Sequence, residues 1–314
     1  MAILFVDIAD ANSGSPLGIG ELVENRRDSI RQIASTTYSL EGVNVILNTL
    51  VKRVLVEDDG KGNKAATGVE LVDGTVIKAK KEVLLAAGTY RTPQILLLSG
   101  IGAAKDLKGI TQTVDLPGVG DNFHDHMSVA QWWKLRHPEA GLAVGSPTFN
   151  DPKFFTGLPM DWIVTQTVPA EGLKNALEKD SGKSEDSNSM ITSERAHTES
   201  FMVYVAASPE NPVIPMDGTH VTTSVLGLLP TSRGTVKLAS TNPEDAPIID
   251  PNYYATEADR YVLRTGLRKL AQTFLETTAG SDIVEKEVVS EGLAPITSSS
   301  SDEEIDAHVR MHGR

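Results

Sequence analysis

The chain has 314 residues, 40% of them hydrophobic and 23% charged, and a formal net charge of −13. This composition is typical of a globular protein with enough chain for one large core or two smaller ones. The negative charge repels phosphate backbones and anionic lipid, so we expect neither a nucleic-acid nor a membrane partner. Without cysteine, disulfides, thiolate nucleophiles and Cys-ligated metal sites are excluded.

The N-terminal sequence does not resemble a signal peptide. Residues 1–6 are mostly apolar but lack basic residues before them, and Asp7 and Asp10 interrupt the run. No apolar stretch reaches the length of a membrane span. The sequence therefore predicts a soluble, cytoplasmic protein, with secretion of a longer parent left open.

Residues 43–79 carry the alternating pattern of β-strands. The runs are separated by turns rich in Asp, Gly and Asn, which predicts a small antiparallel meander. The predicted strands cover residues 43–47, 50–57, 66–72 and 75–79.

A uniformly apolar run, residues 82–88, predicts a buried strand of a parallel sheet. Ligands bind beyond the carboxyl ends of such strands, and the small residues 86–88 would let a ligand approach the backbone. A helix is predicted next, with Thr92 as its N-cap, Pro93 in its first turn and its end at residues 99–100.

The second half of the chain predicts a different architecture. Residues 141–200 are the least regular, and the polar run 179–189 predicts a mobile surface loop. Three later runs are predicted strands of a second, antiparallel sheet: residues 201–205, 221–226 and 234–238. The change of pattern indicates parts of two domains, with a border near residues 105–130.

Two amphipathic helices are predicted near the C-terminus. Thr256 caps the first, whose charged side is better interpreted as a solvated face than as an anion site. Its apolar side carries Leu263, Leu267, Leu270 and Phe274, and its charged side carries Arg260, Arg264 and Lys269. The second begins with a capping box at Ser301 and Glu304 and ends at Gly313.

Two histidine clusters could be metal ligands, but their context argues against it. In His124-Asp125-His126, neighbouring side chains point to different sides of the backbone. His308 and His312 have the spacing of a zincin helix, but Val309 stands where the general-base glutamate would be. We therefore predict no metal site.

Two longer motifs resemble landmarks of the glucose–methanol–choline (GMC) oxidoreductases. Residues 88–102, GTYRTPQILLLSGIG, resemble the second signature of that family at each restricted position, and residues 116–126, LPGVGDNFHDH, resemble its next landmark. A shorter stretch at residues 10–18 resembles fungal members, and residues 232–238 and 249–253 resemble the family's substrate-domain strand and the turn after it. The resemblance is weakest between about residues 140 and 200.

The resemblance implies α/β plus α+β architecture. An incomplete, Rossmann-like FAD-binding domain would cover residues 1–115, and an antiparallel-sheet substrate-binding domain would cover residues 116–314. In the family, a glycine-rich βαβ unit holds the FAD pyrophosphate and begins the protein, so we expect it to lie before Met1.

The resemblance also implies the site residues. Val51 corresponds to the position whose backbone meets the adenine of FAD, and Ala87 and Gly88 lie at the edge that lines the cofactor. The family's catalytic histidine, which takes the alcohol proton while hydride passes to flavin, would lie beyond Arg314. No catalytic residue is therefore predicted within these 314 residues.

The function implied is oxidation of a small-molecule alcohol by an FAD-dependent oxidase or dehydrogenase, in fungal secondary metabolism. Two alternatives stay open: a catalytically incompetent remnant that binds a partner, and a lyase or cyclase on the same scaffold. We also expect exposed apolar surface along the predicted strand at residues 83–87, and possible dependence on another chain that completes the fold.

Overall fold

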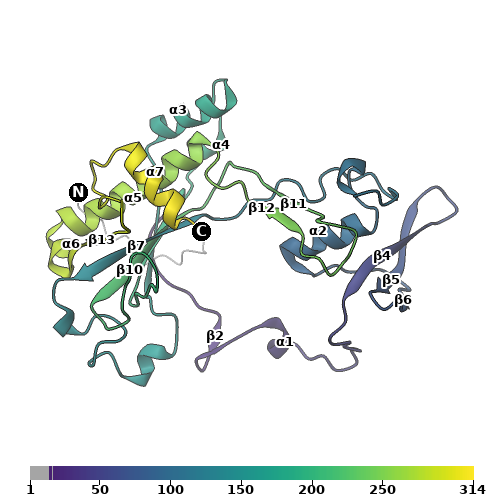
Figure 1. The fold of residues 1–314 in the computed structure, drawn as a ribbon, viewed down its shortest axis with the longest axis horizontal. Coiled ribbons are helices and arrows are strands. Elements are labelled where there is room, and N and C mark those ends of the chain that lie inside the picture. Colours follow the sequence, from purple (N-terminus) through teal and green to yellow (C-terminus); the bar gives the residue numbers. More distant parts are fainter. Residues whose placement is uncertain (1–13, 16) are drawn as a thin grey trace. The chain divides into compact units, whose positions relative to one another are not determined.

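The computed structural model describes residues 14, 15 and 17–314. They form two compact units, each built from separated segments (Figure 1). Unit 1 comprises the described residues up to Ser39 with residues 126–231 and 254–314, and unit 2 comprises residues 40–125 and 232–253. The N-terminal run at residues 1–6 and most of the 10–18 motif lie outside the described residues.

The domain boundary predicted between residues 115 and 116 separates two continuous segments. In the structure residues 232–253 belong instead to the same compact unit as residues 40–125. Both units are therefore discontinuous in sequence. Which unit binds cofactor and which binds substrate stays a prediction.

Unit 1 is built around a six-stranded antiparallel sheet. The strand order is β1 (Gly18–Glu21), β8 (Trp162–Gln166), β9 (Thr198–Val203), β10 (His220–Gly227), β7 (Ser128–Leu135) and β13 (Val284–Val288). Strands β9 and β10 confirm two of the runs predicted for an antiparallel sheet.

Helix α5 (Glu257–Glu276) packs on β9 and β10 of this sheet. It can approach closely because Gly266 faces the sheet, where an added Cβ would lie 2.6 Å from Val225 Cγ1. Trp133 of β7 stacks on Phe274 of the helix, with ring centroids 5.1 Å apart. The predicted cap is confirmed, since the Thr256 side chain accepts a hydrogen bond from the backbone N–H of Asp259.

The prediction of a solvated charged face on α5 is wrong for Arg264, which is only 7% exposed. Its guanidinium pairs with both carboxylate oxygens of Asp306 at 2.7 Å and also contacts Glu257 and Asp302. Helical spacing placed Arg264 away from the sheet. It could not show that a second helix, α7 (Asp302–His312), covers that side.

Helix α7 has the capping box predicted at Ser301 and Glu304, and Ile305 and Val309 are buried as expected. The prediction for residues 141–200 is partly wrong. Helix α3 (Ala170–Ser181) extends into the run predicted as a loop, because Leu173, Ala176 and Leu177 pack against α5. The remaining short helices of unit 1 are α1 (Ala34–Thr37), α4 (Ser189–Thr192) and α6 (Thr278–Ile283), and a small hairpin joins β2 (Arg26–Arg27) to β3 (Ile30–Arg31).

Unit 2 contains the predicted meander. Its strands are β4 (Val51–Asp58), β5 (Lys64–Leu71) and β6 (Val76–Lys78), all antiparallel. Residues 43–47, however, are not a strand, and no strand in the described part of the chain pairs with them. Val43 is 57% exposed and Leu47 75%.

The buried parallel strand predicted at residues 82–88 is also absent. This segment is irregular, and Leu84 is 80% exposed. A buried strand needs neighbours that satisfy its backbone groups, and among the described residues none pairs with this one. The expected exposure of apolar surface is thus seen at Leu84.

Helix α2 (Gly88–Leu98) begins five residues before the predicted first helical position, so the prediction of Thr92 as its N-cap is wrong. Ala87 is the N-cap, and Pro93 lies inside the helix. The end agrees with the prediction: Ser99 is the C-cap, and Gly100 follows with φ +75°. Leu97 and Leu98 are buried and pack in one cluster with Leu107, Val119 and Leu238.

The third predicted strand of the second sheet, residues 234–238, lies in unit 2 instead. It forms β11 (Thr235–Lys237), which pairs with β12 (Ile248–Asp250) in a separate two-stranded ladder. Lys237 links β11 to the landmark turn, since its Nζ contacts Asp121 at 2.5 Å and Asp106 at 3.0 Å.

Candidate functional site

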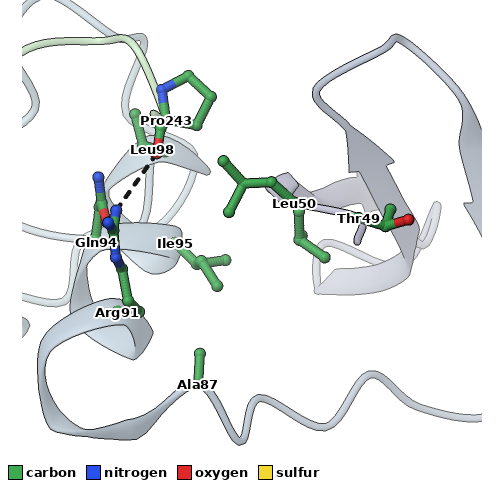
Figure 2. Close-up of a pocket in the computed structure, with 9 residues that line it drawn as sticks. Thr49, Leu50, Ala87, Arg91, Gln94, Ile95, Leu98 and Pro243 are labelled. Carbon is green, nitrogen blue, oxygen red and sulfur yellow. Dashed lines mark hydrogen bonds between the residues drawn. The ribbon is translucent and has the colours of Figure 1, made fainter. Parts of the chain in front are cut away.

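A cavity of about 300 Å3 lies within unit 2 (Figure 2). Three parts of unit 2 form its walls. The first is the chain around the start of β4, the second is one face of α2 with its N-cap, and the third is Pro243 from the 232–253 segment. The lining residues are Thr49, Leu50, Val51, Ala87, Arg91, Gln94, Ile95, Leu98 and Pro243.

The strand side is the irregular beginning of the meander. Val51 opposes Leu71 in the β4–β5 ladder, and the register shifts between Val51 and Arg53. The backbone carbonyl of Leu50 accepts a hydrogen bond from the N–H of Val72 at 3.1 Å. The meander thus fixes the chain where it borders the cavity.

The helix side is a single face of α2. Ala87, Arg91, Gln94, Ile95 and Leu98 are spaced by three or four residues or their sums, so they share one side of the helix. Ile95 and Leu98 supply apolar surface, and Arg91 and Gln94 supply polar groups. Figure 2 shows these side chains on one side of the cavity and Thr49 and Leu50 on the other.

The N-terminus of α2 lies at the Ala87 end of the cavity. The N-cap Ala87 offers no side-chain hydrogen bond, and the first turn contains no acidic residue. Gly88 has φ +78°, and a Cβ added there would meet nothing within 4 Å, so the backbone is open on that side. N–H groups at a helix N-terminus favour an anionic or hydrogen-bond-accepting group.

The polar edge of the cavity joins α2 to a distant loop. Arg91 Nη1 donates to Gln94 Oε1 at 2.6 Å, and Gln94 Nε2 donates to the carbonyl of Asp245 at 2.8 Å. Arg91 Nη1 also lies 3.5 Å from the carbonyl of Pro243 and 3.3 Å from that of Asp245. Gln94 is only 3% exposed, and both ends of its amide have partners.

These residues fit part of an FAD molecule. Ligand cavities usually measure about 300 Å3 or more and combine apolar walls with a few polar groups, as this one does. A whole dinucleotide is much larger, so the cavity accommodates one end of it at most.

The structure brings two of the three predicted cofactor-binding residues together. Val51 and Ala87 line the same cavity although 36 residues separate them, and Gly88 is the next residue, the first of α2. Sequence reasoning missed Arg91, Gln94 and Pro243. Helical spacing from Ala87 could have found the first two, but no local signal places Pro243 beside them.

The histidines considered as metal ligands have other partners. His124 Nδ1 contacts the carbonyl of Asn122 at 3.0 Å. His308 Nε2 contacts the carbonyl of Ala294 at 2.6 Å, and burial lowers the pKa values of His308 and His312. Over the described ranges no three His, Asp or Glu side chains gather as a metal site would require.

Within residues 14, 15 and 17–314, no helix combines the length and apolar character needed to cross a membrane.

Family models for GMC oxidoreductase match residues 8–128 and 230–314. The chain is 41% identical over 308 residues to the GMC-type oxidoreductase acuG of Aspergillus aculeatus, covering 97% of this chain and 58% of that protein. It is 34% identical over 270 residues to human mitochondrial choline dehydrogenase, covering 83% of this chain and 41% of that protein. The chain thus spans less than two thirds of the length of these relatives.

A similar solved structure is the FAD-dependent oxidoreductase from Chaetomium thermophilum, with a TM-score of 0.74 and 22% identity. The match covers 96% of this chain and 57% of that one. The chain therefore shares the fold of that structure, with α/β and antiparallel-sheet parts. The two family models and the relative at 41% identity show that the chain belongs to the GMC oxidoreductase family.

Proposed function

We propose that the chain is part of an FAD-dependent oxidoreductase that oxidises an alcohol, and that the cavity between β4 and α2 holds the adenine end of the cofactor. The flavin, when bound, would accept the hydride, chemistry that side chains do not supply. The residues of this chain would hold and orient the nucleotide.

The observation that carries the proposal is the meeting of Val51 and Ala87 at one cavity. Both were assigned to the cofactor from the family resemblance alone, at positions 36 residues apart in sequence. Ile95 and Leu98 offer apolar surface to a planar base, and the first-turn N–H groups of α2 offer donors at the Ala87 end.

The alcohol substrate rests on the family. The relatives named above are oxidoreductases, and one of them is named for choline, which carries a hydroxyl group. A role in fungal secondary metabolism stays a prediction.

The test is to purify the 314-residue chain with added FAD, desalt it and record the visible absorption spectrum. A retained flavin band that is displaced by excess ADP would support a cavity that holds the adenine end. A colourless protein that also fails to bind ADP by calorimetry would contradict the proposed cofactor site.

A cavity-filling variant localises the binding. Ile95→Trp places a larger side chain in the cavity, and we expect it to weaken FAD and ADP binding together. The matched control is Ile77→Trp on β6, where the side chain is 37% exposed and does not line the cavity. Equal loss of binding in both variants would argue that ligand binds elsewhere in the unit.

A further inference from the structure

One wall of the cavity comes from a turn that is remote in sequence. Pro243 lines the cavity, and the turn around it is braced by its own hydrogen bonds. Ser240 Oγ donates to Asp245 Oδ2 at 2.5 Å, Asn242 Nδ2 donates to Asp245 Oδ1 at 3.2 Å, and the N–H of Asp245 donates to the carbonyl of Asn242 at 3.2 Å. Because these hydrogen bonds join residues on both sides of Pro243, a bond that fixes Asp245 also restrains Pro243.

Two α2 side chains reach this turn. Arg91 Nη1 lies 3.3 Å from the Asp245 carbonyl and 3.5 Å from that of Pro243, and the shortest bond comes from the buried amide of Gln94. Its Nε2 donates to the Asp245 carbonyl at 2.8 Å, while its Oε1 accepts from Arg91 at 2.6 Å. Since an amide has distinct donor and acceptor ends, the Arg91 guanidinium, which can only donate, forces the donor end toward Asp245. Charge-assisted hydrogen bonds of this kind are also stronger than neutral ones.

We propose that Arg91 and Gln94 are positioning residues that latch the Pro243 turn against α2 and so shape the cavity before ligand binds. Arg91 orients the Gln94 amide, Gln94 holds the Asp245 carbonyl, and the turn presents Pro243 to the cavity. This inference rests on the proposed function for its ligand, but the latch itself is a property of the unliganded chain. A wall that is already fixed in the unliganded chain raises affinity, because less conformational entropy is lost when the ligand binds.

The decisive variant is Gln94→Glu. A carboxylate at this position can still accept from Arg91 but has no hydrogen to donate, so the variant loses the 2.8 Å bond to the Asp245 carbonyl and keeps the longer Arg91 contacts. Gln112→Glu is the matched control, because Gln112 Nε2 donates to the Gly102 carbonyl at 2.8 Å in the same unit and lies outside the cavity lining. Circular dichroism confirms that each variant is folded.

The first measurement is hydrogen exchange in the unliganded full chain, read on peptides that cover residues 242–247. We expect exchange there to be at least about fivefold faster in Gln94→Glu and unchanged in Gln112→Glu, as loss of one buried hydrogen bond implies. Unchanged exchange in Gln94→Glu overturns the latch. If Gln94→Glu does not fold, Arg91→Met takes the same test, since it removes the donor that orients Gln94 together with the direct Arg91 contacts to the Asp245 and Pro243 carbonyls.

The second measurement is FAD affinity, where we expect Gln94→Glu to bind about tenfold more weakly than the parent chain. The same substitution in a Pro243→Ala background should change affinity less than about twofold, since the wall that it positions is already gone. An equal effect in both backgrounds overturns action through Pro243. A parent chain that binds no FAD refutes the proposed function, while the exchange result still decides the latch.

Discussion

Residues 220–227 and residues 82–87 are both runs rich in apolar and small residues, yet only the first is a strand. In β10, neighbouring strands pair on both sides, and α5 packs on the sheet. Residues 82–87 have no strand partner among the described residues, and Leu84 is 80% exposed. The run at residues 82–87 is the more apolar of the two, so apolar character alone does not make a strand, and the difference lies in what surrounds each run.

This comparison shows where the stability of unit 1 comes from. Its sheet is held by strand pairing and by α5, and α5 is in turn held by α7 through a buried charge network. The following four predictions compare the stability contributed by the packed parts of unit 1 with that of the unpaired segment at residues 82–87, from the largest expected effect to the smallest.

The largest effect is expected at Arg264. Arg264→Ala leaves the buried Asp306 carboxylate without its bidentate partner, which should cost about 3–5 kcal/mol in the free energy of unfolding of unit 1. Burial by itself would raise the pKa of Asp306, but hydrogen bonds from Arg264 and Tyr254 outweigh it and lower that pKa. Urea denaturation of both chains measures the loss.

The control for Arg264 is Arg310→Ala. Arg310 also faces Asp306, at 3.7 Å, but its side chain is 67% exposed, so its loss should cost no more than about 1 kcal/mol. Similar losses in the two variants would show that burial does not determine the strength of these ion pairs.

The second effect is a pH dependence carried by Glu287 of β13. Its carboxylate is 4% exposed and accepts hydrogen bonds from Gln131 Nε2 at 2.9 Å and from the N–H of Ile296 at 2.6 Å. Burial raises the pKa of Glu287 to about 7, and these two hydrogen bonds only partly oppose it. Between about pH 4.5 and 7, Glu287 is therefore protonated in the folded chain and ionised in the unfolded chain.

A raised carboxyl pKa stabilises the fold fully below the unfolded pKa and loses that contribution as pH rises through the folded pKa. The free energy of unfolding should thus fall by roughly 3 kcal/mol from this group between pH 4.5 and 8. Glu287→Gln should remove that fall, measured as the difference between variant and parent in urea titrations at several pH values.

Glu285→Gln, on the same strand, is the matched control. A hydrogen bond from Lys134 lowers the pKa of Glu285, so its contribution has the opposite sign and is lost as pH decreases. If the Glu287→Gln difference is flat between pH 4.5 and 8, the carboxyl is not titrating in this window.

A smaller effect is expected at the N-cap of α5. Thr256→Ala removes the acceptor for the Asp259 N–H and should cost about 1 kcal/mol, read from the urea midpoint. Thr256→Ser keeps the hydroxyl and should recover most of that loss. Equal destabilisation by Ala and Ser would show that the methyl group, and not the cap, is responsible.

The smallest effect is expected in the unpaired segment. Leu84→Ser should change the free energy of unfolding by less than about 0.5 kcal/mol, because the side chain is already 80% exposed. Measurements at two protein concentrations separate folding from association. A destabilisation that appears only at the higher concentration would show that Leu84 is covered by another copy of the chain.

Much of the candidate site was within reach of the sequence. The motif at residues 88–102 identified the family, and with it Val51, Ala87 and Gly88. The spacing of Arg91, Gln94 and Ile95 on α2 follows from a helix that begins at Gly88, but the sequence predicted the N-cap at Thr92 because proline is common in a first turn. With the helix start misplaced, the polar side of the cavity was missed.

The sequence by itself determined the local elements whose causes are local. The meander depends on alternation and turn residues, and the caps at Thr256 and Ser301 depend on side chains three residues from the N–H groups that they bind. Tertiary structure decided whatever depends on a distant partner. Arg264 is buried only because α7 covers it, residues 82–87 are not a strand because no described strand pairs with them, and Pro243 meets Gln94 across 149 positions of chain.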